Sequence, residues 1–351
     1  MQVDYQAIIR FCVALLVILG LSIFACNRGC NSLPTFSFPK KDSTSTQATK
    51  PLVKIDSNVI FFPAKTMSDS AEKLLDPQNF WPVKLPPILP GSLLPQNRIL
   101  AYYGNLFATK MGVLGEYPKA QMIGKLLAEK QQWAAADLSH PVQLALHAVV
   151  TTAQGKPGAD GKYRLRMNER MVDTLLVWAK EINAVVFIDI QTGRSDLMTE
   201  VPIWEKYLKM PNVHLGIDPE FCMKNNDIPG KRVGLLTDTD INWTINYLKN
   251  LVVANNIPPK VLVVHRFKQD MVGNPQNIKP FSEVQFVLDM DGWGSKELKL
   301  STQLHCIYPA PIEFTGFKLF YKNDIRGKGW SMMTPQEVVS IYPTPLYIQY
   351  Q

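Results

Sequence analysis

An apolar run in the middle of the chain ends in two carboxylates separated by a proline. Residues 213–221 read VHLGIDPEF, which places Asp218 and Glu220 on either side of Pro219. Two nearby carboxyl groups can perform acid–base chemistry when one is protonated and the other is ionised at the working pH. Glycoside hydrolysis needs such a pair around the bond that breaks. Polar groups that merely finish a strand would look the same, so both interpretations stay open at this point.

Three other apolar runs also become polar near their carboxyl ends. Asp189 closes one of them, Asp289 and Asp291 close a second, and His265 lies near the end of a third. Crowded acids repel one another, which raises the pKa of one member of a pair. The candidate catalytic residues are Glu220, Asp218, Asp189 and Asp289.

A second set of candidates offers aromatic rings or hydrogen-bonding groups near the same strand ends. We predict that these residues bind a substrate: Tyr103, His265, Asp291, Trp293, Lys318 and Tyr321. The aromatic members would form a platform for sugar rings. Trp293 directly follows Asp291 and Gly292, which places it well to stack on a sugar ring. His147 and His265 also have a structural interpretation as satisfied core histidines. Asp238 and Asp240 precede a helical pattern and are expected to cap it.

Eight short runs rich in β-branched residues alternate with helical patterns from residue 98 onward. The expected strands are 98–104, 142–153, 184–193, 213–221, a weak 231–237, 260–267, 284–294 and 314–321. The expected helices are 118–136, 168–183, a segment near 196–209, and 240–256. Near-continuous apolar runs are typical of parallel strands that are covered on both faces.

This alternation predicts an α/β fold, a single (β/α)₈ TIM-barrel-like domain over residues 98–351. An open doubly wound sheet is the rival, but residues 102–112 lack the Gly-rich phosphate turn that such a nucleotide fold carries. In a barrel, Asp218 and Glu220 would share one face of the fourth strand, about 6.6 Å apart. They would lie at its carboxyl end, where barrel enzymes build their sites.

The N-terminus predicts export from the cytoplasm. Residues 11–25 form an uncharged apolar stretch that is short for a membrane span and suits a signal peptide. It ends in Ile23-Phe24-Ala25-Cys26, which resembles a bacterial lipobox and makes Cys26 the candidate lipidation site. Residues 1–25 are therefore a signal peptide or a membrane anchor, and a secreted soluble form is the third alternative. Each of them places the domain in the cell envelope or outside the cell.

The composition predicts the organisation of the residues before the barrel and argues against several kinds of partner. Residues 26–57 are rich in Ser, Thr, Lys and Pro and predict a flexible spacer, and residues 58–97 predict a Pro-rich irregular arm. The formal charge of +7 is scattered, so nucleic-acid binding is not predicted. The chain has no C-x-x-C pair, and neither a metal nor another cofactor is predicted. Cys222 and Cys306 fit two buried thiols better than a disulfide.

Several segments, in order, resemble a poorly characterised family of bacterial secreted proteins and lipoproteins with a glycosidase-like TIM barrel. The resemblance spans roughly residues 98–340, and it implies the same fold without implying a substrate. The segments that carry it are FIDIQTGRSD (187–196), LGIDPEF (215–221), PGKRVGLLTDTDIN (229–242), KVLVVHRFKQDM (260–271), GFKLFYKNDI (316–325) and MTPQEV (333–338).

The D-x-E at 218–220 is also similar to the end of the fourth strand in chitinase-like and lysozyme-like barrels. That similarity implies that Glu220 is the general acid and that Asp218 orients an acetamido group of the substrate. The longer acidic signature of chitinases is absent, because Leu215, Gly216 and Ile217 precede Asp218.

Three functions remain open from the sequence. The first is a cell-envelope glycoside hydrolase that acts on a glycan or cell-wall polymer. The second is a non-catalytic envelope protein that binds a glycan or a partner on a barrel scaffold. The third is a metal-dependent hydrolase whose ligands would be His147, Asp189, Asp218, His265 and Asp289.

Overall fold

The structure is a computed structural model that describes residues 81–351. Eight parallel strands form a closed barrel, because the strands pair in chain order and the first also pairs with the second and the last. The barrel strands are β1 (Arg98–Gly104), β2 (Val142–Ala153), β4 (Val185–Ile190), β5 (Val213–Ile217), β6 (Lys260–Arg266), β7 (Val284–Met290), β8 (Phe314–Leu319) and β9 (Tyr347–Tyr350). The predicted (β/α)₈ fold is therefore confirmed.

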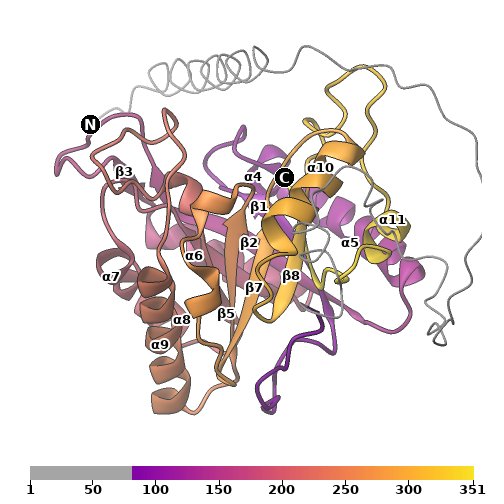
Figure 1. Cartoon of the computed structure of the whole chain (residues 1–351), viewed down its shortest axis with the longest axis horizontal. Coiled ribbons are helices and arrows are strands. Elements are labelled where there is room, and N and C mark those ends of the chain that lie inside the picture. Colours follow the sequence, from indigo (N-terminus) through magenta and orange to yellow (C-terminus); the bar gives the residue numbers. More distant parts are fainter. Residues whose placement is uncertain (1–80) are drawn as a thin grey trace, which may run out of the picture. The chain divides into compact units, whose positions relative to one another are not determined.

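Helices connect most of the strands and pack against the outside of the barrel. Figure 1 shows the strands in the middle, with α7, α8 and α9 on one side and α5 and α11 on the other. The α-helices are α4 (Val113–Glu116), α5 (Lys119–Ala136), α6 (Glu169–Glu181), α7 (Leu197–Glu200), α8 (Glu205–Leu208), α9 (Asp238–Asn255), α10 (Lys296–Thr302) and α11 (Pro335–Val339). Between β6 and β7 only short 3₁₀ turns occur, η3 (Gln269–Met271) and η4 (Pro275–Asn277). A further 3₁₀ turn, η1 (Pro202–Trp204), lies between α7 and α8, and a π-helical turn, η5 (Gln303–Ile307), follows α10.

Local sequence explains where the long helices begin. The Asn168 side chain accepts a hydrogen bond from the Arg170 backbone N–H and caps α6, whose buried residues recur every three or four positions. Thr237 and Asp240 form a reciprocal capping box at the start of α9. The expectation that an acid at this position serves as a cap is met by Asp240. No helix within residues 81–351 is long and apolar enough to cross a membrane.

One predicted strand is wrong, and one barrel strand was not predicted. Residues 231–237 lie in the connection between β5 and α9 and make only isolated bridges. They cannot join the barrel, because β5 pairs directly with β6. The remaining place is taken by β9, a four-residue strand near the C-terminus that pairs with both β8 and β1. The predicted number of barrel strands, eight, is therefore correct, although residues 231–237 are not one of these strands and β9 is.

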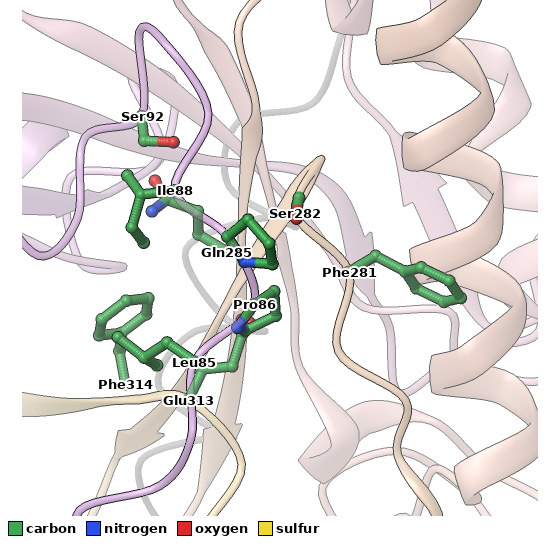
Figure 2. Close-up of a pocket in the computed structure, with 10 residues that line it drawn as sticks. Leu85, Pro86, Ile88, Ser92, Phe281, Ser282, Gln285, Glu313 and Phe314 are labelled. Atoms are coloured by element: carbon green, nitrogen blue, oxygen red, sulfur yellow. The ribbon is translucent and has the colours of Figure 1, made fainter.

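An irregular segment covers the amino-terminal end of the barrel. Residues 81–97 contain neither a helix nor a strand, and β1 begins directly after them at Arg98. The Gln285 side chain, at the start of β7, accepts hydrogen bonds from the backbone N–H groups of Leu93 and Leu94 at 3.0 and 3.1 Å. Figure 2 shows residues of this segment beside Gln285 and Phe314 at the start of β8. The amino-terminal end of the barrel is therefore closed by this segment.

A short hairpin extends β2 beyond the carboxyl end of the barrel. Strand β3 (Arg164–Arg166) runs antiparallel to the last residues of β2. Its two arginines donate hydrogen bonds of 2.8 Å to the buried carboxylate of Glu200, which lies in α7. Arg194 stacks on the ring of Tyr163 at 4.1 Å, which fastens the hairpin to the loop after β4. Ion pairs and a cation–π contact thus hold the hairpin at one side of the carboxyl end of the barrel.

Candidate active site

The inside of the barrel changes from apolar to polar toward its carboxyl end. Alternate residues of a strand face the interior, so a residue two positions further on points the same way. Apolar side chains that pack inside the barrel are Ala145, Phe187, Val263 and Val287. Two residues after each of them come polar groups that are completely buried: His147, Asp189, His265 and Asp289.

Asp189 lies at the centre of these four residues. Its Oδ2 atom is 2.9 Å from Nε2 of His147 and 2.9 Å from Nε2 of His265. The other ring nitrogen of His265, Nδ1, is 3.1 Å from Oδ2 of Asp289. Four strands that are not all neighbours are therefore joined by side-chain hydrogen bonds across the interior. We call these four residues the central cluster.

The last strand supplies partners that the sequence did not predict. The hydroxyl of Tyr347 lies 2.5 Å from Nδ1 of His147, and Nε2 of Gln349 donates to that hydroxyl at 2.8 Å. Both residues belong to β9, which was not recognised as a strand. The only signal for it was the short alternation in Leu346-Tyr347-Ile348-Gln349-Tyr350 after two prolines.

Two glycines make room for the central cluster. A Cβ atom on Gly216 of β5 would lie 2.4 Å from Nε2 of His147 and 2.8 Å from Oδ2 of Asp189. A Cβ atom on Gly316 of β8 would lie 2.4 Å from Oδ1 of Asp289. Real Cβ atoms do not approach other atoms this closely, so these positions must stay without side chains for the cluster to form.

Charge in the central cluster is set by burial and by close partners. Burial alone would lower the pKa of His265, but the carboxylates of Asp189 and Asp289 raise it well above its usual value. Burial lowers the pKa of His147, which therefore stays neutral. Burial alone would raise the pKa of Asp189, but its two histidine partners hold that pKa below its usual range. The cluster thus contains a histidine cation held between carboxylates.

Asp218 and Glu220 lie above the central cluster, and their local structure differs from the prediction. Strand β5 ends at Ile217, and η2 (Pro219–Phe221) is a turn of 3₁₀-helix. Asp218 is the N-cap of this turn, because its Oδ1 atom accepts a hydrogen bond from the backbone N–H of Glu220 at 3.0 Å. The expectation that both carboxylates continue one strand face is therefore wrong. Pro219 explains the change, since proline is well suited to the first position of a helical turn.

Both carboxyl groups at this turn are biased toward the protonated state. Burial, with the nearby charges of Asp189 and Asp291, raises the pKa of Asp218 to about 6. Burial, with the charges of Asp218 and Asp291, raises the pKa of Glu220 to about 8. Asp218 is buried, whereas Glu220 is only partly buried. Near pH 7, Glu220 is therefore a proton donor beside a largely ionised carboxylate.

The remaining predicted residues divide into those that join the site and those that do not. Nζ of Lys318 is 3.0 Å from Oδ2 of Asp291 and lies 4.0 Å from the centre of the Tyr103 ring. Asp291 in turn lies 3.3 Å from Nδ1 of His265. Tyr103, Asp291 and Lys318 thus extend the central cluster toward the rim. Trp293 is partly buried in the loop after β7, two residues beyond Asp291.

Tyr321 lies elsewhere. Its hydroxyl is 2.8 Å from that of Tyr102 and also donates to Glu129 of α5 at 2.8 Å. Its ring stacks on Tyr350, with ring centres 4.9 Å apart. Tyr102 and Tyr350 pack in the core between the barrel and its helices, so Tyr321 belongs to the outside of the wall. The structure does not bring it together with the rim carboxylates.

Gln191 belongs to the site but is not among the site residues predicted from the sequence. It directly follows β4, and its Nε2 atom donates a hydrogen bond of 3.0 Å to Oδ2 of Asp218. Its Oε1 atom accepts from the backbone N–H of Ala153. Gln191 therefore fixes the Asp218 carboxylate relative to β2 and β4.

The cysteines bear on the site only indirectly. Cys222 and Cys306 are both buried free thiols, as expected. The Cys222 thiol donates to the backbone carbonyl of Asp218 at 3.2 Å, and burial raises its pKa to about 12. It therefore supports the turn as a neutral group. Cys26 lies outside the described residues.

Among the described residues, one group of His, Cys, Asp and Glu side chains has the spacing of a metal site. It consists of His147, Asp189 and His265, whose ligand atoms lie within 4.8 Å of one another. Asp218 and Asp289, which the metal-hydrolase hypothesis also included, are not part of this group.

Comparison with known proteins adds a likeness of fold. No family model matches the sequence, and a search of curated proteins also gave no match. Among solved structures, the crystal structure of a ruminal GH26 endo-beta-1,4-mannanase is similar, with 10% identity and a TM-score of 0.34. The match covers 83% of this chain and 66% of the mannanase chain, slightly less than two thirds of its length. A likeness at this level supports no conclusion about this chain.

Proposed function

We propose that this protein hydrolyses glycosidic bonds of a glycan at the carboxyl end of its barrel, with Glu220 as the general acid. The observation that carries the proposal is the pair formed by Asp218 and Glu220 on one capped turn. Burial, with nearby carboxylates, raises the pKa of Glu220 to about 8 and that of Asp218 to about 6. Two carboxyl groups with separated pKa values, next to one another at a barrel mouth, suit acid-catalysed cleavage.

The two carboxyl groups would have different roles. Glu220 would protonate the leaving oxygen, and the ionised Asp218 would stabilise the positive charge that develops on the sugar ring. Asp218 is ionised above about pH 6 and Glu220 is protonated below about pH 8. Asp189 and Asp289 are bonded to His265 and completely buried, so they would act through the residues above them.

Groups around the two carboxyls would bind the sugar. The ion pair of Lys318 and Asp291 offers both a donor and an acceptor for hydroxyl groups. Trp293 is placed on the neighbouring loop, where its ring would stack on a sugar face. Tyr321 has no role in this proposal, because it lies in the wall outside the barrel.

The test is a screen for the release of new reducing ends. We expect the purified chain to cleave at least one member of a panel of peptidoglycan, chitin oligosaccharides, β-mannan and xylan. Tyr321→Phe is the matched control, since it removes a hydroxyl outside the barrel and should leave turnover unchanged. Binding to one of these glycans without any cleavage would instead favour the non-catalytic function.

The N-terminal sequence supports a proposed location in the cell envelope, with lipid attached at Cys26. The lipobox-like residues 23–26 carry this proposal. We expect wild-type protein to sediment with membranes and to incorporate labelled palmitate. Cys26→Ala should lose the label, whereas Cys30→Ala, four residues further on, should retain it. Equal labelling of both variants would contradict the proposal.

A further inference from the structure

The central cluster places three potential metal ligands around one point. Nε2 of His147 and Nε2 of His265 each lie 2.9 Å from the same oxygen, Oδ2 of Asp189. Two imidazoles and one carboxylate are a common ligand set for divalent transition metals in proteins. The three side chains are completely buried and belong to three different strands, so the barrel fixes their relative positions.

Both histidine rings are oriented by partners outside this group. Nδ1 of His147 faces the hydroxyl of Tyr347, and Nδ1 of His265 faces the carboxylate of Asp289. Metal-binding histidines almost always engage their second nitrogen in this way. Each Nε2 atom would exchange its contact with Asp189 for a bond to the ion, and His265 would release its Nε2 proton. The pair of His265 and Asp289 has the carboxylate–histidine arrangement of such sites.

One further feature fits an ion better than a closed hydrogen-bond set. The second oxygen of Asp189, Oδ1, is buried and has no hydrogen-bond partner among the described residues. Gly216 of β5 packs closely against the ligand atoms on one side, since a Cβ there would lie 2.4 Å from Nε2 of His147, so an ion would have to bind on the side away from β5. Oδ1 of Asp189 is therefore a carboxylate oxygen that a bound ion would provide with a partner.

The spacing also suits a metal. Bonds of about 2.0–2.2 Å to zinc place neighbouring ligand atoms roughly 3.3 Å apart in a tetrahedral site. The observed separations of 2.9 Å are shorter by a few tenths of an ångström. A small outward shift of each ring would admit the ion. Three protein ligands would leave at least one position for water or another small ligand.

We propose that His147, Asp189 and His265 bind one divalent transition-metal ion at the base of the barrel mouth. The ligands of this site are distinct from the proposed acid pair, because neither Asp218 nor Glu220 is among them. These three residues are among the ligands of the metal-dependent hydrolase considered from the sequence, but no motif distinguishes them from Asp218 and Asp289, since they lie 42 and 76 positions apart along the chain.

The test uses zinc and the full chain, purified in detergent and treated with a chelator. We expect one zinc ion per chain after dialysis, and a melting temperature several degrees higher with zinc than without it. His147→Gln should weaken zinc binding by more than about 100-fold, and Tyr347→Phe, which removes only the partner of Nδ1, by roughly 10-fold. His305→Gln is the matched control, because His305 is exposed and distant in sequence, and it should bind zinc as the wild type does.

A measurement on the wild type guards against a ligand variant that fails to fold. Cobalt added in place of zinc should give visible absorption bands of the intensity typical of four- or five-coordinate sites with nitrogen ligands. The proposal is overturned if the wild type retains no stoichiometric zinc. It is also overturned if a folded His147→Gln variant binds zinc as tightly as the wild type, or if the cobalt spectrum is that of the hydrated ion.

Discussion

Asp189→Ala is expected to lower the free energy of unfolding by about 4 kcal/mol in the chelator-treated protein. The substitution removes the acceptor of both histidine Nε2 atoms and leaves His147 and His265 without it in a completely buried site. Removing one partner of a buried pair leaves the other uncompensated, which costs more than the pair contributes. Chemical denaturation of the variant and the wild type measures the difference.

The matched control for this prediction is Asp227→Ala. Asp227 also pairs with a cation, Arg232, at 3.4 Å, but both side chains are exposed. Exposed pairs contribute little, so this variant should lose less than about 0.5 kcal/mol. A loss below about 1 kcal/mol for Asp189→Ala would show that the central cluster does not depend on its central carboxylate.

Glu220→Gln is expected to reduce turnover of the cleaved glycan by about 10³-fold, since general acid catalysis contributes 10²–10⁴-fold. Glutamine keeps the size of the side chain but cannot give up a proton. The loss should be much smaller with an aryl glycoside, whose leaving group departs without protonation. Wild-type turnover should be bell-shaped in pH, falling below about 6 as Asp218 becomes protonated and above about 8 as Glu220 ionises.

The same variant provides its own folding control. Burial raises the pKa of Glu220 in the folded state, so the folded protein favours the protonated form of this side chain. Ionisation of Glu220 therefore destabilises the fold as the pH rises from the pKa of Glu220 in the unfolded chain toward 8. Glu220→Gln avoids this loss. Its free energy of unfolding should equal that of the wild type near pH 4 and exceed it by about 2 kcal/mol at pH 8, after allowance for screening by solvent. A variant less stable than wild type at pH 8 would contradict the buried, repelling environment assigned to Glu220.

The sequence by itself determined the architecture and the strand ends that carry polar groups. Apolar runs that alternate with amphipathic patterns are local signals, and they identified seven of the eight barrel strands. The polar residues two positions beyond Phe187, Val263 and Val287 could be predicted to share a face with them, because strand geometry fixes that relation.

The tertiary structure decided which of those residues meet. β9 is only four residues long, and pairing on both sides is what holds it in the barrel. Tyr103 and Tyr321 both lie near strand ends, but Tyr103 lies inside the barrel and Tyr321 lies outside it. Proline and a side-chain cap turned Asp218 and Glu220 out of the strand.

The central cluster depends most strongly on the closed barrel. His147, Asp189 and His265 are far apart in the chain, and they touch because closure of the barrel brings β2, β4 and β6 to a common interior. Gly216 and Gly316 gain their role only there, since the atoms that a side chain would strike belong to other strands. Periodicity along the sequence indicates on which face of a strand a side chain lies. Contacts across a barrel are set instead by the register of the strands and by closure of the barrel.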